Sequence, residues 1–180
     1  MSKLSVLLES LESAPKILGR IARDLSKEEA CRRGKSGGFS FVENIWHMAD
    51  LEREGYSERI QRLKAEQHPS LPDFEGERLA AERQYQNRNL AEGVALFDRA
   101  RSDNLGTLRT LSEAEWKRAG SQAKVGEVTL QDLPRMMAEH DQSHARDIRQ
   151  LLSEVVPARP TLPELGQLAE RDDPALDPSQ

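Results

Sequence analysis

Apolar residues recur with the period of an α-helix in four separate segments of this chain. The first segment extends from about Lys3 to Asp24, and Pro15 predicts a kink within it. The second opens with a capping box of Ser40 and Glu43 and extends to about Lys64. The apolar positions of the first segment share one side of the helix: Leu4, Leu7, Leu8, Leu11, Ile17, Leu18 and Ile21.

The third and fourth segments are also typical of helices. Asn89 is a capping residue for the third, which continues to about Leu111. The fourth starts between Thr129 and Leu133, so that Pro134 falls in its first turn, and ends near Val155. Nothing longer than a few residues alternates as a strand would. The pattern therefore predicts an all-α fold.

The connections between these segments predict the architecture. The stretch 68–73 contains two prolines and cannot continue a helix, so it forms a long crossing loop. Ser112 caps one short turn, and residues 120–126 read as a loop. Four helices with one long connection favour an antiparallel four-helix bundle over residues 1–156. Residues 157–180 form a Pro-rich acidic tail that we expect to be mobile, although residues 162–169 could dock as a helical turn.

Composition narrows the class of protein. The chain has 180 residues, a net charge of -5 and one cysteine, which suits one domain without disulfides. No apolar run is long enough for a membrane helix. The acidic balance argues against a nucleic-acid partner, and the short basic stretch 31–35 is expected to be a solvated loop. Glu9 interrupts any signal-peptide pattern, and together with the lone Cys31 it predicts a cytoplasmic protein.

Two histidines of the fourth segment carry the first chemical signal. His140 and His144 are four residues apart, so they lie on one face of the helix, one turn from each other. That face also carries Leu133, Met137, Ile148 and Leu151, and it therefore points at the core. Buried imidazoles need partners for their nitrogens, and a metal ion would supply them. The alternative interpretation is a solvated pair.

His47 is a third candidate ligand, at the flank of the apolar stripe of the second segment. Alone it would be more typical of a histidine bonded between helices. With His140 and His144 it completes a face of three nitrogens that leaves coordination positions open to water or substrate, as in catalytic sites. Zinc, nickel, iron and copper all suit three imidazoles. His68 lies in the Pro-rich loop and is expected at the surface.

Three carboxylates accompany these histidines. Glu52 falls near the middle of the apolar arc, where an unpaired carboxylate would be costly to bury. It is either an acid–base group or a group that supports the metal ligands, or else it forms a buried ion pair or a hydrogen bond to a neighbouring helix. Asp50 and Asp141 lie close to His47 and His140 along the chain and could orient their N–H groups. The alternative for both aspartates is a solvated surface charge.

The residues also resemble a known family. The stretch 39–52, which reads FSFVENIWHMADLE, and the segments 69–74, 111–118, 126–130 and 140–144 are similar in order and spacing to the DinB-like superfamily. The likeness covers about residues 4–152. It implies a four-helix bundle in which His47, His140 and His144 bind a divalent ion, with zinc or nickel first. It also implies relatives that are transferases or isomerases using bacterial thiols such as mycothiol or bacillithiol, and frequent homodimers.

The resemblance and the residues together lead to one hypothesis and two alternatives. The leading hypothesis is a thiol-cofactor-dependent transferase acting on a small molecule. The three histidines hold the ion, Glu52 or a metal-bound water manages protons, and Asp50 is a further catalytic candidate. One alternative is metal-assisted hydrolysis. The other is a non-enzymatic stress-response module, in which a structural metal joins the second and fourth helices and Cys31 is the candidate fourth ligand.

Overall fold

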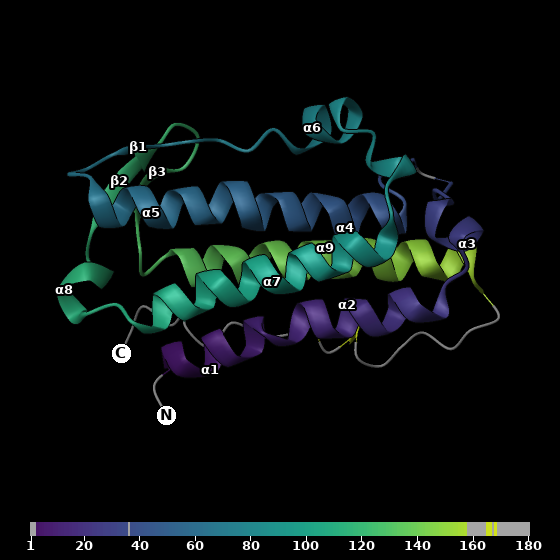
Figure 1. Ribbon diagram of the computed structural model, residues 1–180, viewed down its shortest axis with the longest axis horizontal. Helices are drawn as coiled ribbons and strands as arrows, with labels where there is room; N and C mark the ends of the chain where they lie inside the picture. The colour runs from purple at the N-terminus through teal and green to yellow at the C-terminus, as the bar shows by residue number, and fades with distance from the viewer. Residues whose placement is uncertain (1–2, 36, 158–164, 167, 169–180) are drawn as a thin grey trace.

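Four long helical rods lie side by side along one axis in the computed structural model, which describes residues 3–35, 37–157, 165–166 and 168 (Figure 1). The first rod is α1 (Lys3–Leu11) followed by α2 (Ser13–Asp24), and the second is α4 (Phe41–Asp50), η1 (Leu51–Tyr56) and α5 (Ser57–Ala65). The third is α7 (Leu90–Arg109) and the fourth α9 (Leu133–Val155). The four-helix bundle expected from the hydrophobic pattern is confirmed.

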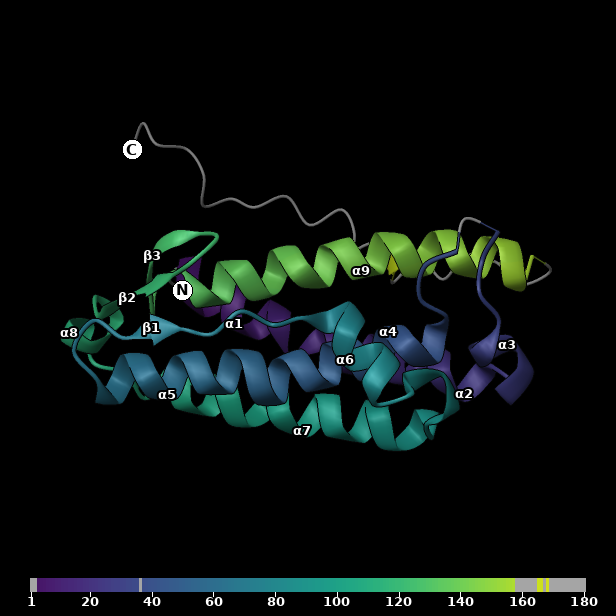
Figure 2. The same cartoon turned by 90° about the horizontal axis from the view of Figure 1, so that it is seen from above.

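Contacts between the rods define their directions. His47 contacts His140 and the earlier Asn44 contacts His144, so the second and fourth rods are antiparallel. The second and third rods run in the same direction, because Trp46 donates to the carbonyl of Asn89, just before α7, and the later Glu52 accepts from Asn104. The long connection makes this possible. It returns along the bundle through β1 (Ser70–Leu71), α6 (Gly76–Glu82) and η2 (Tyr85–Asn87), as Figure 2 shows.

The first rod breaks earlier than the sequence predicted. The interruption lies at Glu12, between α1 and α2, and not at Pro15. Pro15 is the third residue of α2, where the backbone N–H that proline lacks would have no helical acceptor in any case. The interruption of this segment that Pro15 predicted is therefore present, three residues earlier in the chain than the proline.

The second rod is not a uniform α-helix. Its middle, η1, is a π-helix, a form found mostly as single turns and frequently at functional sites. Gly55 lies in this turn, and a Cβ there would lie 2.5 Å from Cδ1 of Leu51. The backbone of this π-turn is therefore packed closely against the side chain of Leu51. Hydrophobic periodicity alone predicted a continuous helix here.

A small three-stranded sheet caps one end of the bundle. β2 (Ala119–Gln122) pairs antiparallel with β3 (Gly126–Thr129) and parallel with β1. Residues 120–126 therefore belong to a hairpin, and the predicted loop is confined to its turn at residues 123–125. The strands are too short to show an alternation of apolar and polar residues. Their backbones lie close together, since a Cβ at Gly120 would lie 2.6 Å from the carbonyl oxygen of Pro69.

The remaining short elements follow their capping residues. Asn89 caps α7 and Ser112 caps α8 (Glu113–Trp116), both as predicted, while α3 (Lys27–Cys31) begins at Ser26 with a capping box. Of the predicted tail, Leu165 and Leu168 are buried in the core, as a docked turn requires. The rest of the predicted mobile tail lies outside the described residues.

The core is divided by a layer of buried charge. One apolar cluster includes Phe97 and Ile148, and another includes Leu105 and Met137. Between these levels lies the buried side chain of Arg101, with the carboxylates that surround it. Within the described part of the chain, no helix combines the length and apolar character needed to cross a membrane.

Candidate metal centre

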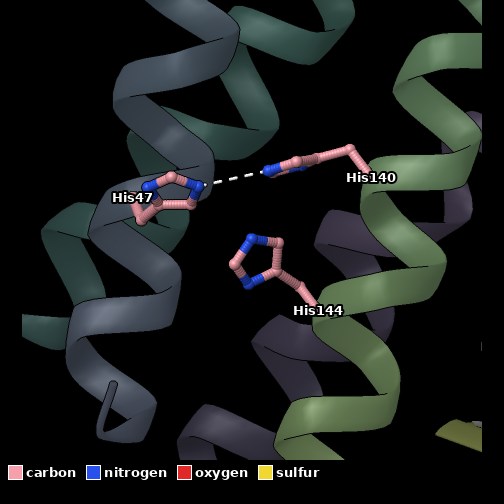
Figure 3. A group of neighbouring side chains, drawn as sticks. All are labelled: His47, His140 and His144. Atoms are coloured by element: carbon pink, nitrogen blue, oxygen red, sulfur yellow. Dashed lines mark hydrogen bonds between the residues drawn. The ribbon is translucent and has the colours of Figure 1, made fainter. Parts of the chain in front are cut away.

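Three imidazole rings from two helices converge inside the bundle. His47 projects from α4, and His140 and His144 project from successive turns of α9 (Figure 3). Each ring offers one nitrogen to a group whose members all lie within 4.8 Å of one another. The ring centroids are 4.4–5.3 Å apart. The structure thus brings together the three histidines that the sequence singled out.

The spacing fits a shared cation. Nε2 of His47 lies 3.1 Å from Nε2 of His140. With metal–nitrogen bonds of about 2.0–2.1 Å, two ligands lie about 3.3 Å apart in a tetrahedral site and about 2.9 Å apart at a right angle. The observed separation falls between these values. The same two nitrogens can also share one proton.

A hydrogen bond fixes the orientation of His144. Its Nδ1 lies 2.7 Å from Oδ1 of Asn44. The amide nitrogen of Asn44 donates to the carbonyls of Phe39 and Ser40, so its oxygen is the acceptor for the imidazole. Nδ1 of His144 therefore carries the hydrogen, and Nε2 keeps its lone pair for a ligand bond. This is the arrangement by which a bonded neighbour orients a metal ligand.

Packing holds the ring of His47. The rings of Phe39 and Phe74 lie 5.5 and 5.7 Å from it, centroid to centroid. Gly76 covers its edge so closely that a Cβ there would lie 2.3 Å from Cε1. The buried Nδ1 of His47 has no hydrogen-bond partner within the described residues. His47 is thus positioned by shape, whereas His144 is positioned by a hydrogen bond.

The three imidazoles are held neutral. Burial, followed by the neighbouring His144, lowers the pKa of His47 to about 4. Burial is also the main cause that lowers the pKa of His144 and brings the pKa of His140 well below its usual value. At neutral pH every ring therefore has an unprotonated nitrogen, as metal ligation requires.

Glu52 belongs to a buried ion cluster one layer away. It accepts a hydrogen bond from Asn104, and one of its oxygens lies 3.1 Å from Nε of Arg101, a charge contact without hydrogen-bond geometry. Arg101 forms two hydrogen bonds with Asp141, of 2.8 and 2.9 Å. The prediction that Glu52 needs a partner is confirmed. For Asp141 the surface alternative is wrong, and its carboxylate bonds to Arg101 and not to an imidazole.

Asp50 is likewise buried, so the surface alternative is wrong for it too. The hydroxyl of Tyr85 donates to it at 2.6 Å, and Arg53 and Arg83 form ion pairs with it. These contacts join α4 to the crossover. They involve no imidazole nitrogen, although the negative charge of Asp50 acts on the pKa of His47 in the raising direction.

A small cleft of about 250 Å³ opens beside His144. Its lining includes Phe39 and Asn44, together with Asp147, Gln150 and Glu154 of α9. A small molecule in this cleft would lie against one of the three imidazoles. The acidic side chains of the wall favour a neutral or amine-bearing molecule over an anion.

Two residues of this centre, Asn44 and Gly76, were not predicted from the sequence. One residue that was considered as a ligand, Cys31, lies outside it. Asn44 could have been predicted, because it lies one turn before His47 and an amide at that position can reach a neighbouring helix. Gly76 gave no signal. Cys31 is not in the histidine group, which has three members in the part of the chain that the structure describes, and its Sγ lies 3.7 Å from the carbonyl of Gln86 instead. His68 is exposed, as predicted.

Fold and site together define a helical bundle with an internal group of three histidines. The chain belongs to the DinB superfamily, whose sequence profile matches residues 10–148. Among solved structures it is similar to YfiT from Bacillus subtilis, described as a probable metal-dependent hydrolase with an unusual four-helix bundle topology. The TM-score is 0.76 with 19% identity over 84% of this chain and 88% of YfiT, which shows the shared fold. No curated protein matches the chain.

Proposed function

We propose that this chain is an enzyme that uses a divalent cation held by His47, His140 and His144. The observation that carries the proposal is the convergence of three neutral imidazoles within 4.8 Å, with one of them oriented by Asn44. Neutral nitrogen ligands leave most of the charge of the ion uncompensated. Three protein ligands would also leave room for a further group, as in catalytic zinc sites.

Hydrolysis of a small substrate is the reaction class that we propose first. A bound divalent cation supplies Lewis acidity, which lowers the pKa of a water molecule or a thiol and makes it a nucleophile near neutral pH. The cleft beside His144 can hold a small neutral or amine-bearing substrate next to the histidines. The description of YfiT as a probable metal-dependent hydrolase is consistent with this class.

Thiol-dependent transfer is the second candidate. The resemblance to relatives that use mycothiol or bacillithiol favours it. The thiol would need to approach His144, where Asp147 and Glu154 face the cleft and would repel carboxylates of a cofactor. For this reason we propose transfer as the second reaction class, after hydrolysis. For both reactions we propose zinc or nickel as the bound ion.

The predicted catalytic roles of Glu52, as an acid–base group, and of Asp50, as a residue that orients an imidazole, remain part of the proposal. Burial raises the pKa of Glu52, while Arg101 and Asn104 oppose that rise. Asp50 is bonded to Tyr85 and paired with two arginines. These contacts support positioning of α4 and η1 around the histidines more than proton transfer at a substrate.

A cytoplasmic location and a homodimer complete the proposal, and sedimentation velocity tests the dimer.

The test is turnover by metal-loaded protein. Metal-free protein is loaded in turn with zinc, nickel, cobalt, manganese or iron(II), and small esters and amides are assayed with and without added thiols. We expect metal-dependent hydrolysis without thiol, at least about 100-fold lower in His144→Ala and unchanged in the exposed control His68→Ala. Turnover that requires mycothiol or bacillithiol would favour the transferase. Tight metal binding without turnover in either assay would favour the structural module.

A further inference from the structure

A second hollow of this molecule is far larger than the cleft at the histidines, and it shares no lining residue with them. It lies where α2 passes alongside α7, next to α3, at one end of the bundle (Figure 1). We propose that this groove is a binding site for a small amphipathic organic anion, a molecule with an apolar body and one carboxylate, sulfonate or phosphate group.

The size and the floor of the groove suit the apolar body. Its volume is about 1010 Å³, at the upper end of the range of small-molecule sites. α2 and α7 meet beside the hollow at Gly19, where a Cβ would lie 3.1 Å from Val94. The apolar part of the lining, here called the floor, includes Ala22, Ala30, Val42, Ala91, Val94 and Ala95. Such a floor favours hydrocarbon or aromatic groups.

The rim of the groove is cationic. Of the described residues that line it, five carry positive charge, and the acidic one is Asp98. The cations are Lys16, Arg20, Arg23, Lys27 and Arg88. This is opposite in sign to the chain as a whole, whose net charge is -5. A local excess of positive charge over an apolar floor selects for anionic, partly apolar ligands.

Three of the cations come from α2. Lys16, Arg20 and Arg23 follow one another at spacings of four and three residues, so they form one stripe on the helix. Like charges at this spacing destabilise a helix. Arg23 and Lys27 form no ion pair within the described part of the chain. A bound anion would relieve the repulsion.

Arg88 is held ready at the opposite side of the groove. Its guanidinium lies 4.4 Å from the centre of the Trp46 ring, and its Nε donates to the carbonyl of Arg83. Both contacts reduce the freedom that the side chain would lose on binding a ligand. The groove therefore offers cations from α2, from α3 and from the link between η2 and α7.

The test compares two fluorescent probes that differ in charge alone. 8-Anilinonaphthalene-1-sulfonate carries a sulfonate, and N-phenyl-1-naphthylamine is the same ring system without it. We expect one sulfonate probe per chain, bound about tenfold more tightly than the neutral probe, with the difference reduced at high salt. The single cysteine locates the probe, because Cys31 lines the groove and its alkylation by N-ethylmaleimide should slow when the sulfonate is bound.

Charge reversal at the rim provides the matched comparison. The double variant Arg23→Glu/Lys27→Glu should weaken binding of the sulfonate about tenfold or more and leave the neutral probe unaffected. Arg99→Glu/Lys124→Glu is the control, since it changes the net charge equally at side chains that are 84% and 81% exposed and lie outside the groove. All four positions are exposed, so each variant is expected to fold.

Three outcomes would overturn the proposal. The first is equal affinity for the two probes, which would make the groove merely apolar. The second is equal loss of sulfonate binding in the rim and control variants, or alkylation of Cys31 that the probe does not slow. The third is binding of polyglutamate without binding of the sulfonate probe, which would assign the groove to an acidic protein segment.

Discussion

Oδ1 of Asn44 accepts a hydrogen bond from Nδ1 of His144 across 2.7 Å, between residues that are 100 positions apart in the chain. The amide is locked in turn by its own bonds to the carbonyls of Phe39 and Ser40, at the capped start of α4. Local hydrogen bonds at the start of α4 therefore set the tautomer of a candidate metal ligand on another helix.

The first prediction concerns this bond. Asn44→Ala should lower the affinity for zinc or cobalt about 10-fold to 100-fold, the usual effect of losing a group that orients a ligand. Asn104→Ala is the control, because it also removes a buried amide but one that bonds to Glu52. Competition with a chromophoric chelator measures both affinities. Equal affinity in the two variants would show that Asn44 does not orient the site.

Gly76 gives a second prediction, from steric reasoning. In Gly76→Ala the added Cβ would displace the ring of His47, because it would lie 2.3 Å from Cε1. We expect metal affinity to fall about tenfold or more with little loss of helix content. Gly106→Ala is the control, since a Cβ there meets nothing within 4 Å and alanine favours a helix by up to about 1 kcal/mol. Unchanged affinity in Gly76→Ala would mean that His47 does not need its observed position.

The buried ion cluster supports a prediction about stability. Arg101→Ala leaves Glu52 and Asp141 buried without their cation, so the free energy of unfolding should fall by about 3–5 kcal/mol. Arg109→Ala breaks an exposed pair with Glu12 and should cost about 1 kcal/mol or less. Urea unfolding of metal-free protein measures both. A cost for Arg101→Ala as small as that for Arg109→Ala would contradict the role of this charged layer.

The lowered pKa of His47 predicts a pH dependence for the metal-free protein. Histidine in the unfolded chain titrates near 6.5, while the pKa of His47 in the folded chain is about 4. Between these values the unfolded chain binds a proton that the folded chain does not. The contribution to stability is therefore complete above about pH 6.5 and is lost as the pH falls toward 4.

The size of this effect follows from the shift. Two to three pKa units correspond to about 3 kcal/mol, of which the partly exposed ring retains roughly 1–2 kcal/mol. Unfolding by urea at pH 7.5, 5.5 and 4.5 should show a shallower loss of stability in His47→Leu than in the unsubstituted protein. Identical pH profiles would place the imidazole in a solvated environment instead.

Much of the fold could be predicted from the sequence where local signals agree with the packing. The cap at Asn89 and the spacing of His140 and His144 each depend on neighbours along the chain, and the structure bears them out. The parallel course of α4 and α7 and the hairpin at Gly120 depend on contacts between distant segments. Neither a very short strand nor the direction of a helix produces a periodic pattern of apolar residues. The hydrophobic pattern therefore could not predict them.

The same distinction explains the site. His47 lies at the flank of its apolar stripe, yet it reaches the other two histidines because a flanking position on α4 faces α9. Asp141 was expected to bond an imidazole or solvent, and it bonds Arg101 of α7 instead. The partner of the buried Asp141 depends on which other helix packs against it, and here that helix is α7. One sequence without its contacts cannot identify that helix.

The central claim is that three histidines bind one divalent cation, and a cobalt(II) titration of metal-free protein tests it most directly. Visible absorption and elemental analysis should show one ion per chain. The tight site should be lost in His47→Ala and in His144→Ala and kept in His68→Ala. If His47→Ala and His144→Ala bind cobalt with the stoichiometry and affinity of the unsubstituted chain, the three histidines are not the metal site.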